Sequence, residues 1–330
     1  MTVDTDVQIL VPLQARSTLT LDDASRQTRA SFFEHARRAY SGARKRTLKR
    51  VRFLVRALCR YRLHDAWLRL LETPALGPMI ARQPSMCAKI QHDYALSGLT
   101  TADRLALART HFDTFLSRVP RTLVSTIYVG TGLLLATMEA GEARYELRLF
   151  HLPHCWQEGE VSLGLFEEGA LICSATFVLG TARGFSPDLP DAHTLFVGGI
   201  QGVQGSDGQA IFRRATKAMQ GLRPFSLLIC ALRSLSGSLG AAGLHAVADA
   251  RHALRYKRAR QRIRLSYDEL WREHGATAAG TGTGVFDLGA SAAPKNLADV
   301  PSHKRAQYRR RCVLLESIDA QIRATLANCG

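Results

Sequence analysis

The 330-residue chain lacks the long apolar segments of an integral membrane protein. None of its apolar runs reaches the roughly 18 residues that a membrane-spanning helix requires. Its first residues, MTVDTDVQILVPLQARS, place acids before a short apolar patch, whereas a secretory signal has basic residues before a longer apolar segment. We therefore expect a soluble, cytoplasmic protein.

The chain also lacks the cysteine pattern of a disulfide-rich or zinc-binding domain. It contains 7 cysteines, an odd number, and no two of them form a Cys-x-x-Cys pair. A disulfide framework or a structural zinc site is therefore not expected. His151, His154 and Cys155 lie close together, but such a cluster between strands is more often incidental than metal-binding. We predict no metal site.

Acidic and aromatic residues are both scarce. The 28 Asp and Glu residues stand against 44 Lys and Arg residues, which gives a net charge of +16 and favours anionic partners. A basic solvated surface without a ligand explains the same charge. Aromatic residues make up 7% of the chain, and no helix-turn-helix, zinc finger or aromatic RNA-binding motif is present. We therefore expect phosphate-bearing ligands or acidic lipid as partners, and not nucleic acid.

The N-terminal third is predicted to be helical and strongly basic. Residues 1–30 are polar without a clear period and predict a loose arm, and residues 31–120 predict a helical region packed on the main domain, 121–330. A capping box at residues 100–103 predicts the start of a helix. Apolar residues recur at three- and four-residue spacing and predict one apolar stripe: Leu48, Phe53, Leu54, Ala57, Leu58 and Tyr61. The basic face is then either a solvated surface or a clamp for phosphate or anionic lipid headgroups.

The middle of the chain changes from helical to strand periodicity. Residues 145–151 alternate between polar and apolar, and residues 161–166, 170–179 and 194–200 are largely apolar, which predicts strands joined by turns. The remaining elements follow in this order: helices at 207–220 and 225–239, a strand at 244–248, a short helix from Tyr267 to Gly275, a strand at 285–288 and a helix from Lys304 to about Leu326. Strands grouped in hairpins predict an α+β fold with a mainly antiparallel sheet.

Several short sequence words carry a family resemblance. They are Gly198-Gly199-Ile200-Gln201-Gly202, Ala215-Thr216-Lys217-Ala218 with Gly221-Leu222-Arg223-Pro224, Tyr267-Asp268 with Trp271 and Gly275, and Lys304-Arg305-Ala306 with Tyr308-Arg309-Arg310-Arg311. Together, over residues 35–330, these words resemble the VirK/YbjX family, which is built on a domain of unknown function. The resemblance implies a Gram-negative cytoplasmic protein linked to virulence, envelope maintenance and resistance to cationic antimicrobial peptides. One departure is Asp249, where the family commonly has Asn.

The glycine-rich bend after Ile200 organises the second half of the chain. A strand, a glycine turn and a helix can present bare backbone N–H groups at a helix start, which suits a phosphate. The order of elements is also similar to the GNAT acyltransferase fold, and that similarity implies transfer of an acyl group from CoA or acyl-carrier protein to an amine. The amides that would hold the pyrophosphate belong to Gln201, Gly202, Gln204, Gly205 and Ser206. Gln204 and Ser206 stand where that fold usually has glycines, and a turn that serves packing alone explains the bend equally well.

The same similarity implies roles for three residues after the bend. Tyr267 would protonate the departing thiolate, and His252 or Asp249 would accept the proton of the amine. Each also has a structural explanation: Tyr267 as a core residue at a helix start, Asp249 as a helix cap and His252 as a surface group. The enzymatic hypothesis predicts that two neighbouring strands part beside Gln201. A bend filled by side chains, with its amides bonded internally, would contradict it.

A non-enzymatic function is the alternative that the sequence leaves open. In this hypothesis the protein is a virulence or envelope-maintenance factor that binds anionic lipid or a protein partner through its basic face. It would then associate peripherally with the inner membrane. Neither hypothesis requires a permanently bound cofactor.

Overall fold

The structure, a computed structural model, describes residues 31–43, 45–141, 143–203, 205, 207–260, 265–289 and 300–328. The arm predicted for residues 1–30 lies outside them. Residues 31–39 form a helix. The later helical elements are α2 (Arg46–Cys59), α3 (Tyr61–Leu71), α4 (Gly77–Arg82), η1 (Pro84–Gln91), α5 (Thr101–Arg118), α6 (Arg121–Tyr128), η2 (Pro153–Cys155), α7 (Ala182–Phe185), α8 (Gly208–Ala218), α9 (Pro224–Ser238), η3 (Asp249–Arg251), α10 (Arg255–Ala259), α11 (Tyr267–Glu273) and α12 (Ser302–Ala327). The strands are β1 (Leu133–Ala140), β2 (Ala143–Phe150), β3 (Val161–Glu167), β4 (Ala170–Thr181), β5 (His193–Gly202), β6 (Gly243–Val247), β7 (Thr277–Ala278) and β8 (Val285–Asp287).

The described strands form one sheet in the order β1-β2-β3-β4-β5-β6-β8-β7. Neighbouring strands are antiparallel except β5 and β6, which are parallel and are joined by α8 and α9. The predicted α+β fold with a mainly antiparallel sheet is therefore confirmed, and a helical region precedes the sheet as predicted. The sequence gives no clear signal for β1, because a bulge between Leu134 and Ala136 interrupts its alternation.

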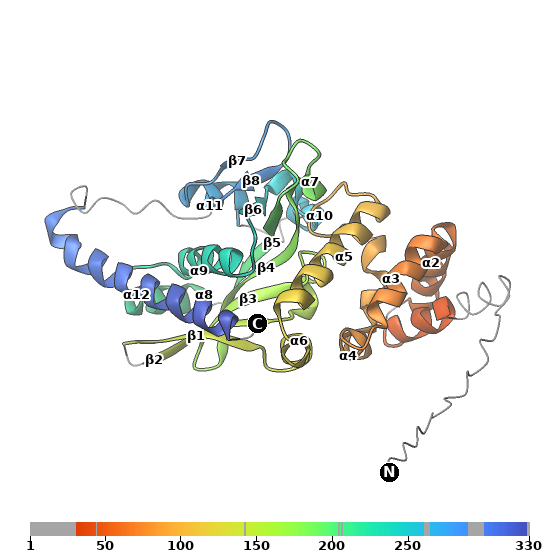
Figure 1. Cartoon of the computed structure of the whole chain (residues 1–330), viewed down its shortest axis with the longest axis horizontal. Coiled ribbons are helices and arrows are strands. Elements are labelled where there is room, and N and C mark those ends of the chain that lie inside the picture. Colours follow the sequence, from red (N-terminus) through yellow and green to blue (C-terminus); the bar gives the residue numbers. More distant parts are fainter. Residues whose placement is uncertain are drawn as a thin grey trace, which may run out of the picture.

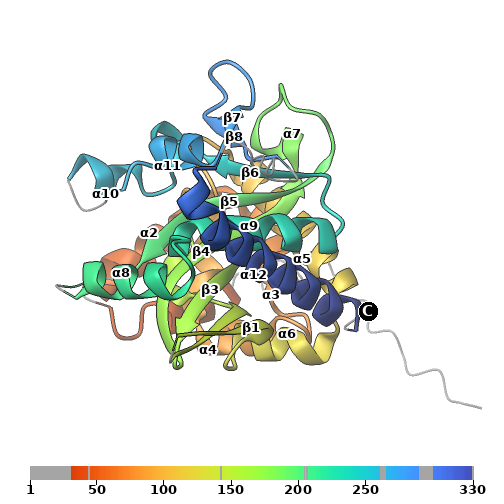
Figure 2. The same cartoon turned by 90° about the vertical axis from the view of Figure 1, so that its left-hand side faces the viewer.

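Helices cover both faces of the sheet (Figures 1 and 2). On one side α5 packs on β4, and α3 and η1 pack on α5. On the other side α9 packs on β3, β4, β5 and β6, and α12 covers α9 and reaches β1. Because α9 lies between the sheet and α12, most of its surface is apolar, and Leu227, Leu228 and Leu232 are fully buried. Each such leucine contributes about 1.5–3 kcal/mol to the free energy of folding.

The N-terminal helices confirm one sequence prediction and correct another. Thr100 and Asp103 form the predicted capping box at the start of α5. The single apolar stripe is wrong. Phe53 and Ala57 of α2 are buried, whereas Leu48 and Leu58 are exposed. Tyr61, the last member of the predicted stripe, belongs to α3 and is also exposed. The spacing alone did not show that apolar residues lie on two different faces of α2.

No helix in the described part of the chain combines the length and the apolar character that a bilayer span requires.

Candidate functional site

The parallel strands β5 and β6 run side by side for only part of their length. Thr194 to Val197 pair with Gly243 to Ala246, and β5 then continues beside β4 as far as Gly202. The two strands therefore part after Val197 and before Gln201, which is the feature that the enzymatic hypothesis requires. The ends of parallel strands at such a point are a common place for ligand sites.

Glu158, from the segment between β2 and β3, lies against β5 where the two strands part. A Cβ added at Gly198 would lie 1.9 Å from the carbonyl oxygen of Glu158, and a Cβ at Gly199 would lie 2.6 Å from its carboxyl carbon. Any residue larger than glycine would collide with Glu158 at either position. The two adjacent glycines of the first sequence word thus allow this carboxylate to pack directly on the strand.

Glu158 orients a histidine at this point. Glu158 is 1% exposed, and one of its carboxylate oxygens accepts a hydrogen bond from Nε2 of Gln201 at 2.7 Å. The other oxygen lies 3.1 Å from Nε2 of His252, which is fully buried and not the surface group that the sequence allowed. Nδ1 of His252 accepts the N–H of Leu254 at 3.2 Å, so in the neutral ring the proton lies on Nε2 and points to Glu158.

Helix α11 is fastened to both parted strands. The hydroxyl of Tyr267 accepts the N–H of Ile200 on β5 at 3.3 Å and donates to the carbonyl of Ile200 at 3.2 Å. The indole Nε1 of Trp271 donates to the carbonyl of Val247, at the end of β6, at 2.8 Å. The rings of Tyr267 and His252 have their centroids 4.9 Å apart. α11 therefore holds the two strands at a fixed separation and places Tyr267 beside His252.

Asp249 accepts hydrogen bonds from the first residues of α11. Its Oδ1 accepts the N–H of Tyr267 at 2.8 Å, and its Oδ2 accepts the hydroxyl of Ser266 at 3.1 Å. In return, Oδ1 of Asp268 accepts the N–H of Asp249 at 2.8 Å. The structure thus brings Tyr267, His252 and Asp249 together, and Asp249 supports the start of α11, whose N-cap is Ser266.

The strand side of the glycine bend uses its amides internally, which agrees with a turn that serves packing and counts against the predicted cradle of free backbone N–H groups on this side. The N–H of Val203 donates to the carbonyl of Ile172 at 2.7 Å, and that of Ile200 is bonded to Tyr267. A Cβ at Gly202 would lie 2.9 Å from the ring of Phe212, and Gly205 has a φ of +119°, a conformation that favours glycine. The predicted phosphate ligands Gln204 and Ser206 lie outside the described residues. The side chain of Gln201 is bonded to Glu158 and therefore lies with the buried cluster.

Cys155 is buried in the same cluster. Its sulfur lies 3.0 Å from Nε2 of Gln201. Burial, and then the charge of Glu158, raises the pKa of the thiol, which disfavours a reactive thiolate. His151 is hydrogen-bonded to Gln83 and to the backbone carbonyl of Glu160, and His154 is exposed. Among the described residues no three His, Cys, Asp or Glu side chains are placed to hold a metal ion.

A second buried carboxylate, Glu160, lies two residues further along. It forms an ion pair with Nζ of Lys89 at 2.8 Å and accepts the hydroxyl of Tyr94 at 2.7 Å. Nζ of Lys89 also donates to the carbonyl of Gly159 at 2.9 Å and lies 4.4 Å from the centre of the Tyr94 ring. Burial lowers the pKa of Lys89, and the charge of Glu160 opposes that shift. This cluster joins η1 to the start of β3.

Basic helices follow the ends of both parted strands. After β5, α8 carries the exposed side chains of Arg213 and Lys217. After β6, α10 carries Arg255 and Lys257. Both helices project from the same side of the molecule, beyond the end of β5 (Figure 2). Basic side chains therefore lie on the helices that follow both parted strands.

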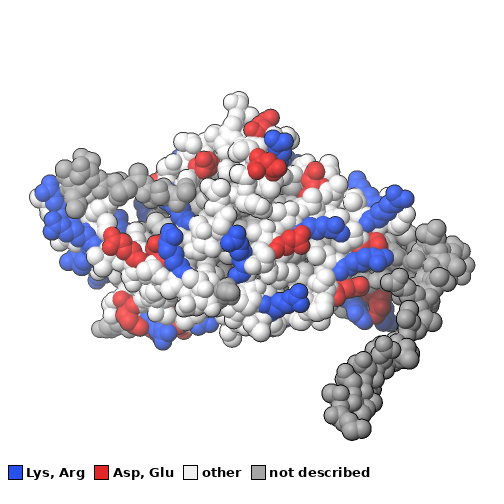
Figure 3. Space-filling model, viewed as in Figure 1, with Lys and Arg blue, Asp and Glu red and all other residues white. Residues whose placement is uncertain are grey.

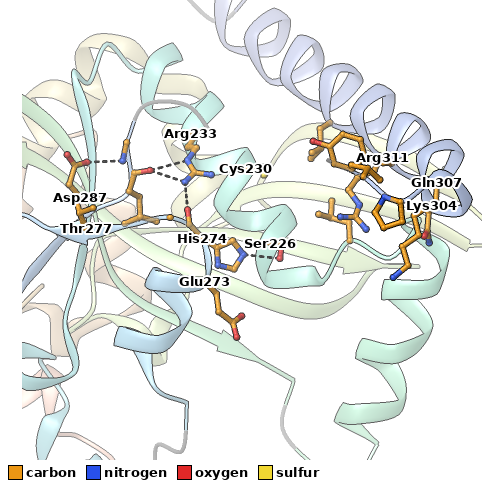
Figure 4. Close-up of a pocket in the computed structure, with 18 residues that line it drawn as sticks. Ser226, Cys230, Arg233, Glu273, His274, Thr277, Asp287, Lys304, Gln307 and Arg311 are labelled. Carbon is orange, nitrogen blue, oxygen red and sulfur yellow. Dashed lines mark hydrogen bonds between the residues drawn. The ribbon is translucent and has the colours of Figure 1, made fainter. Parts of the chain in front are cut away.

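A separate cleft of about 860 Å³ opens between α9, the end of α11 and the start of α12 (Figure 4). Arg233 of α9 donates to the carbonyls of Leu288 at 2.9 Å and His274 at 3.0 Å. Lys304 and Arg311 of α12 lie on the other wall (Figure 4). The Arg233 guanidinium already donates to these backbone carbonyls, so Arg233 connects α9 to the chain that follows β8. None of the predicted site residues lines the cleft.

Glu158 is the member of the site that the sequence did not single out. The sequence does contain a signal for it: Glu158 and Glu160 stand directly before an apolar strand, and carboxylates that are buried beside such a strand require hydrogen-bonding or charged partners. Those partners could not be found by local spacing, because His252 lies 94 positions from Glu158.

The chain is similar to bacterial proteins of unknown function. A family model described as "Protein of unknown function (DUF535)" matches residues 42–324. The uncharacterized protein YbjX of Escherichia coli K12 is 29% identical over 282 residues, which cover 83% of this chain and 82% of that protein. An uncharacterized protein of Haemophilus influenzae is 28% identical over 130 residues, which cover 39% of this chain and 43% of that protein. No solved structure matches the chain.

Proposed function

The chain belongs to the DUF535 family, the VirK/YbjX family that its sequence words indicated, and we propose that it transfers an acyl group to an amine of an envelope or peptide substrate. The donor in this proposal is a pantetheine carrier, either CoA or acyl-carrier protein. The observation that carries the proposal is the parting of β5 from β6 beside Gln201. It occurs in a sheet whose order of elements is similar to the GNAT acyltransferase fold.

The charge near the parted strands supports a phosphate-bearing donor. Arg213 and Lys217 follow β5, and Arg255 and Lys257 follow β6. Cations on flexible side chains attract phosphate groups, and the effect weakens with added salt. We therefore assign the phosphates of the donor to the surface between α8 and α10, and its thioester to the end of β5.

The buried cluster supplies groups for acid–base chemistry. In the proposed reaction the amine nitrogen attacks the thioester carbonyl, a C–N bond forms and the C–S bond breaks. His252, oriented by Glu158 through Nε2, accepts the proton of the amine at Nδ1, which must first release the N–H of Leu254, and Tyr267 protonates the departing thiolate. Both side chains are buried, so the thioester must displace the hydroxyl of Tyr267 from Ile200 to reach them. Asp249 holds α11 in place during this step.

The test is binding of acetyl-CoA and palmitoyl-CoA by isothermal titration at low salt. Gly202→Trp should abolish binding, because its side chain would clash with Phe212 and push α8, with Arg213 and Lys217, away from the end of β5. Gly42→Trp is the matched control, since nothing lies within 4 Å of a Cβ at that position. Charge reversal at Arg213 and Lys217 tests the same surface without filling the bend, and circular dichroism checks that each variant folds.

Turnover is measured by mass spectrometry of a lysine-containing peptide incubated with acyl-CoA. His252→Ala should slow acylation by about 100-fold or more, the usual contribution of a general base. Absence of binding by any acyl-CoA and by acyl-carrier protein would overturn the proposal. The non-enzymatic alternative predicts that outcome, together with salt-sensitive liposome association that survives changes at Tyr267 and His252.

A further inference from the structure

The outward face of α2 is apolar. Leu48, Val51, Val55 and Leu58 follow one another at intervals of three and four residues, and their exposed fractions range from 44% for Leu58 to 54% for Val55. Phe53 and Ala57 on the opposite side are buried. Since a helix rises about 1.5 Å per residue, this apolar stripe is about 15 Å long. A contiguous exposed apolar patch marks a surface that meets another apolar phase.

Positive charge borders this stripe. Lys49, Arg52 and Arg56 are exposed on one side of it, and Arg46 lies at the start of the helix. The sequence contains no acid between Glu34 and Asp65. No ion pair joins these α2 cations to a carboxylate within the described part of the chain. Basic side chains gather over α2 and, at the far end of the molecule, over the start of α12 (Figure 3).

This combination fits a planar anionic surface with an apolar layer beneath it. A helix that lies in a membrane interface has a strongly polar basic side and an apolar side that enters the boundary between headgroups and acyl chains. Arginine and lysine beside the apolar stripe can reach lipid phosphates while their stems lie along the interface. An acidic protein groove would need both an apolar floor and acidic walls, whereas an anionic bilayer supplies both features everywhere.

We propose that α2 docks the protein on an anionic bilayer, with Leu48, Val51, Val55 and Leu58 entering the interface and Arg52 and Arg56 contacting phosphates. This proposal goes beyond acyl transfer and does not depend on it, because α2 contributes none of the residues at the parted strands. It predicts peripheral attachment that is weakened by salt, since exposed charges are screened.

The experiment is co-sedimentation of the full chain with vesicles. Vesicles of phosphatidylcholine with about a third phosphatidylglycerol should bind the protein at least about ten-fold more tightly than pure phosphatidylcholine vesicles, because several cations face the anionic headgroups. The double variant Val51→Asp with Val55→Asp should lose about ten-fold or more of this binding, because both charges would enter the apolar layer. Both positions are exposed, so the fold should not change.

Val313→Asp is the matched control. Val313 is 64% exposed and follows three arginines on α12, the other basic helix. It should bind anionic vesicles as the unchanged protein does. Arg52→Glu with Arg56→Glu should also lose binding, and Arg309→Glu on α12 should lose much less.

The outcomes separate the possibilities. Binding that is lost only in the α2 variants supports the proposal. Equal binding to both vesicle types, no binding by the unchanged protein, or loss in Val313→Asp instead of the α2 variants would each overturn it. Capture of the free protein by an acidic peptide, without vesicle binding, would show that α2 docks on a protein instead.

Discussion

Glu158 and Glu160 are separated by one glycine, are both buried, and are neutralised in different ways. Glu160 meets Lys89 and Tyr94, so its charge is balanced by a full opposite charge and a hydroxyl. Glu158 meets His252 and Gln201, so its charge is met by hydrogen-bond donors on an imidazole and an amide. One pair joins the helical layer to the sheet, and the other lies where β5 and β6 part.

The difference separates a structural pair from a candidate site. A buried carboxylate with a buried lysine is strongly destabilised when one partner is removed, because the other charge is left alone. A carboxylate beside a histidine can remain hydrogen-bonded when its charge is removed. We therefore expect changes around Glu160 to affect folding first, and changes around Glu158 to affect folding less and the proposed acyl transfer more.

The largest effect is expected for Lys89→Met. It leaves Glu160 as an unpaired buried carboxylate and should lower the free energy of unfolding by about 3–5 kcal/mol, measured by urea denaturation. The double variant Lys89→Met with Glu160→Gln should recover most of the stability. A loss of less than about 1 kcal/mol in Lys89→Met would contradict the assignment of this pair as structural.

A smaller loss is expected for Tyr94→Phe. It removes the hydroxyl that donates to Glu160 at 2.7 Å and keeps the ring beside Lys89. A hydrogen bond to a charged group is worth about 1.5–3 kcal/mol, and this loss should be seen in the same urea experiment. Tyr256→Phe is the control, because Tyr256 is exposed. Equal stability of the two variants would mean that Lys89 alone satisfies Glu160.

Glu158→Gln should cost less, about 1–2 kcal/mol, because the amide keeps the shape and can still accept from His252. Glu160→Gln, which leaves Lys89 charged and buried, should cost more than Glu158→Gln. Thermal unfolding of the two variants side by side measures the difference directly. If Glu158→Gln proved the more damaging of the two, the comparison between the carboxylates would be reversed.

The smallest effect is expected for Tyr267→Phe, about 1 kcal/mol, since it removes one hydroxyl that bridges the N–H and carbonyl of Ile200. Hydrogen exchange of the Ile200 amide should become faster, and that of Val197, which precedes the parting, should not. Unchanged exchange at Ile200 would show that Tyr267 does not hold β5.

Much of the fold follows from local sequence signals. The capping box at Thr100, the helix at α8 and the short strand β6 are fixed by hydrogen-bonding side chains or by periodicity within a few residues. The face that α2 turns outward could not be predicted, because both of its faces carry apolar residues and packing on α3 and η1 decides between them.

The candidate site was predicted in part. Tyr267, His252 and Asp249 do lie together, because α11 follows the end of β6 by a short connection. The role of Glu158 was not predicted, because Glu158 precedes β3 whereas His252 follows β6, 94 residues later in the chain. From the sequence, Asp249 could either support a helix start or act as a base. Only the structure shows that it accepts hydrogen bonds from Ser266 and Tyr267.

The double attachment of α11, through Tyr267 to β5 and through Trp271 to β6, makes it a mechanical link between two sides of the parting. A ligand that separates β5 from β6 must strain the hydrogen bonds of α11. Because coupling free energies are reciprocal, weakening these bonds must strengthen binding of that ligand by the same free energy. Variants of Trp271, which is fully buried, should therefore change the affinity for the proposed acyl donor.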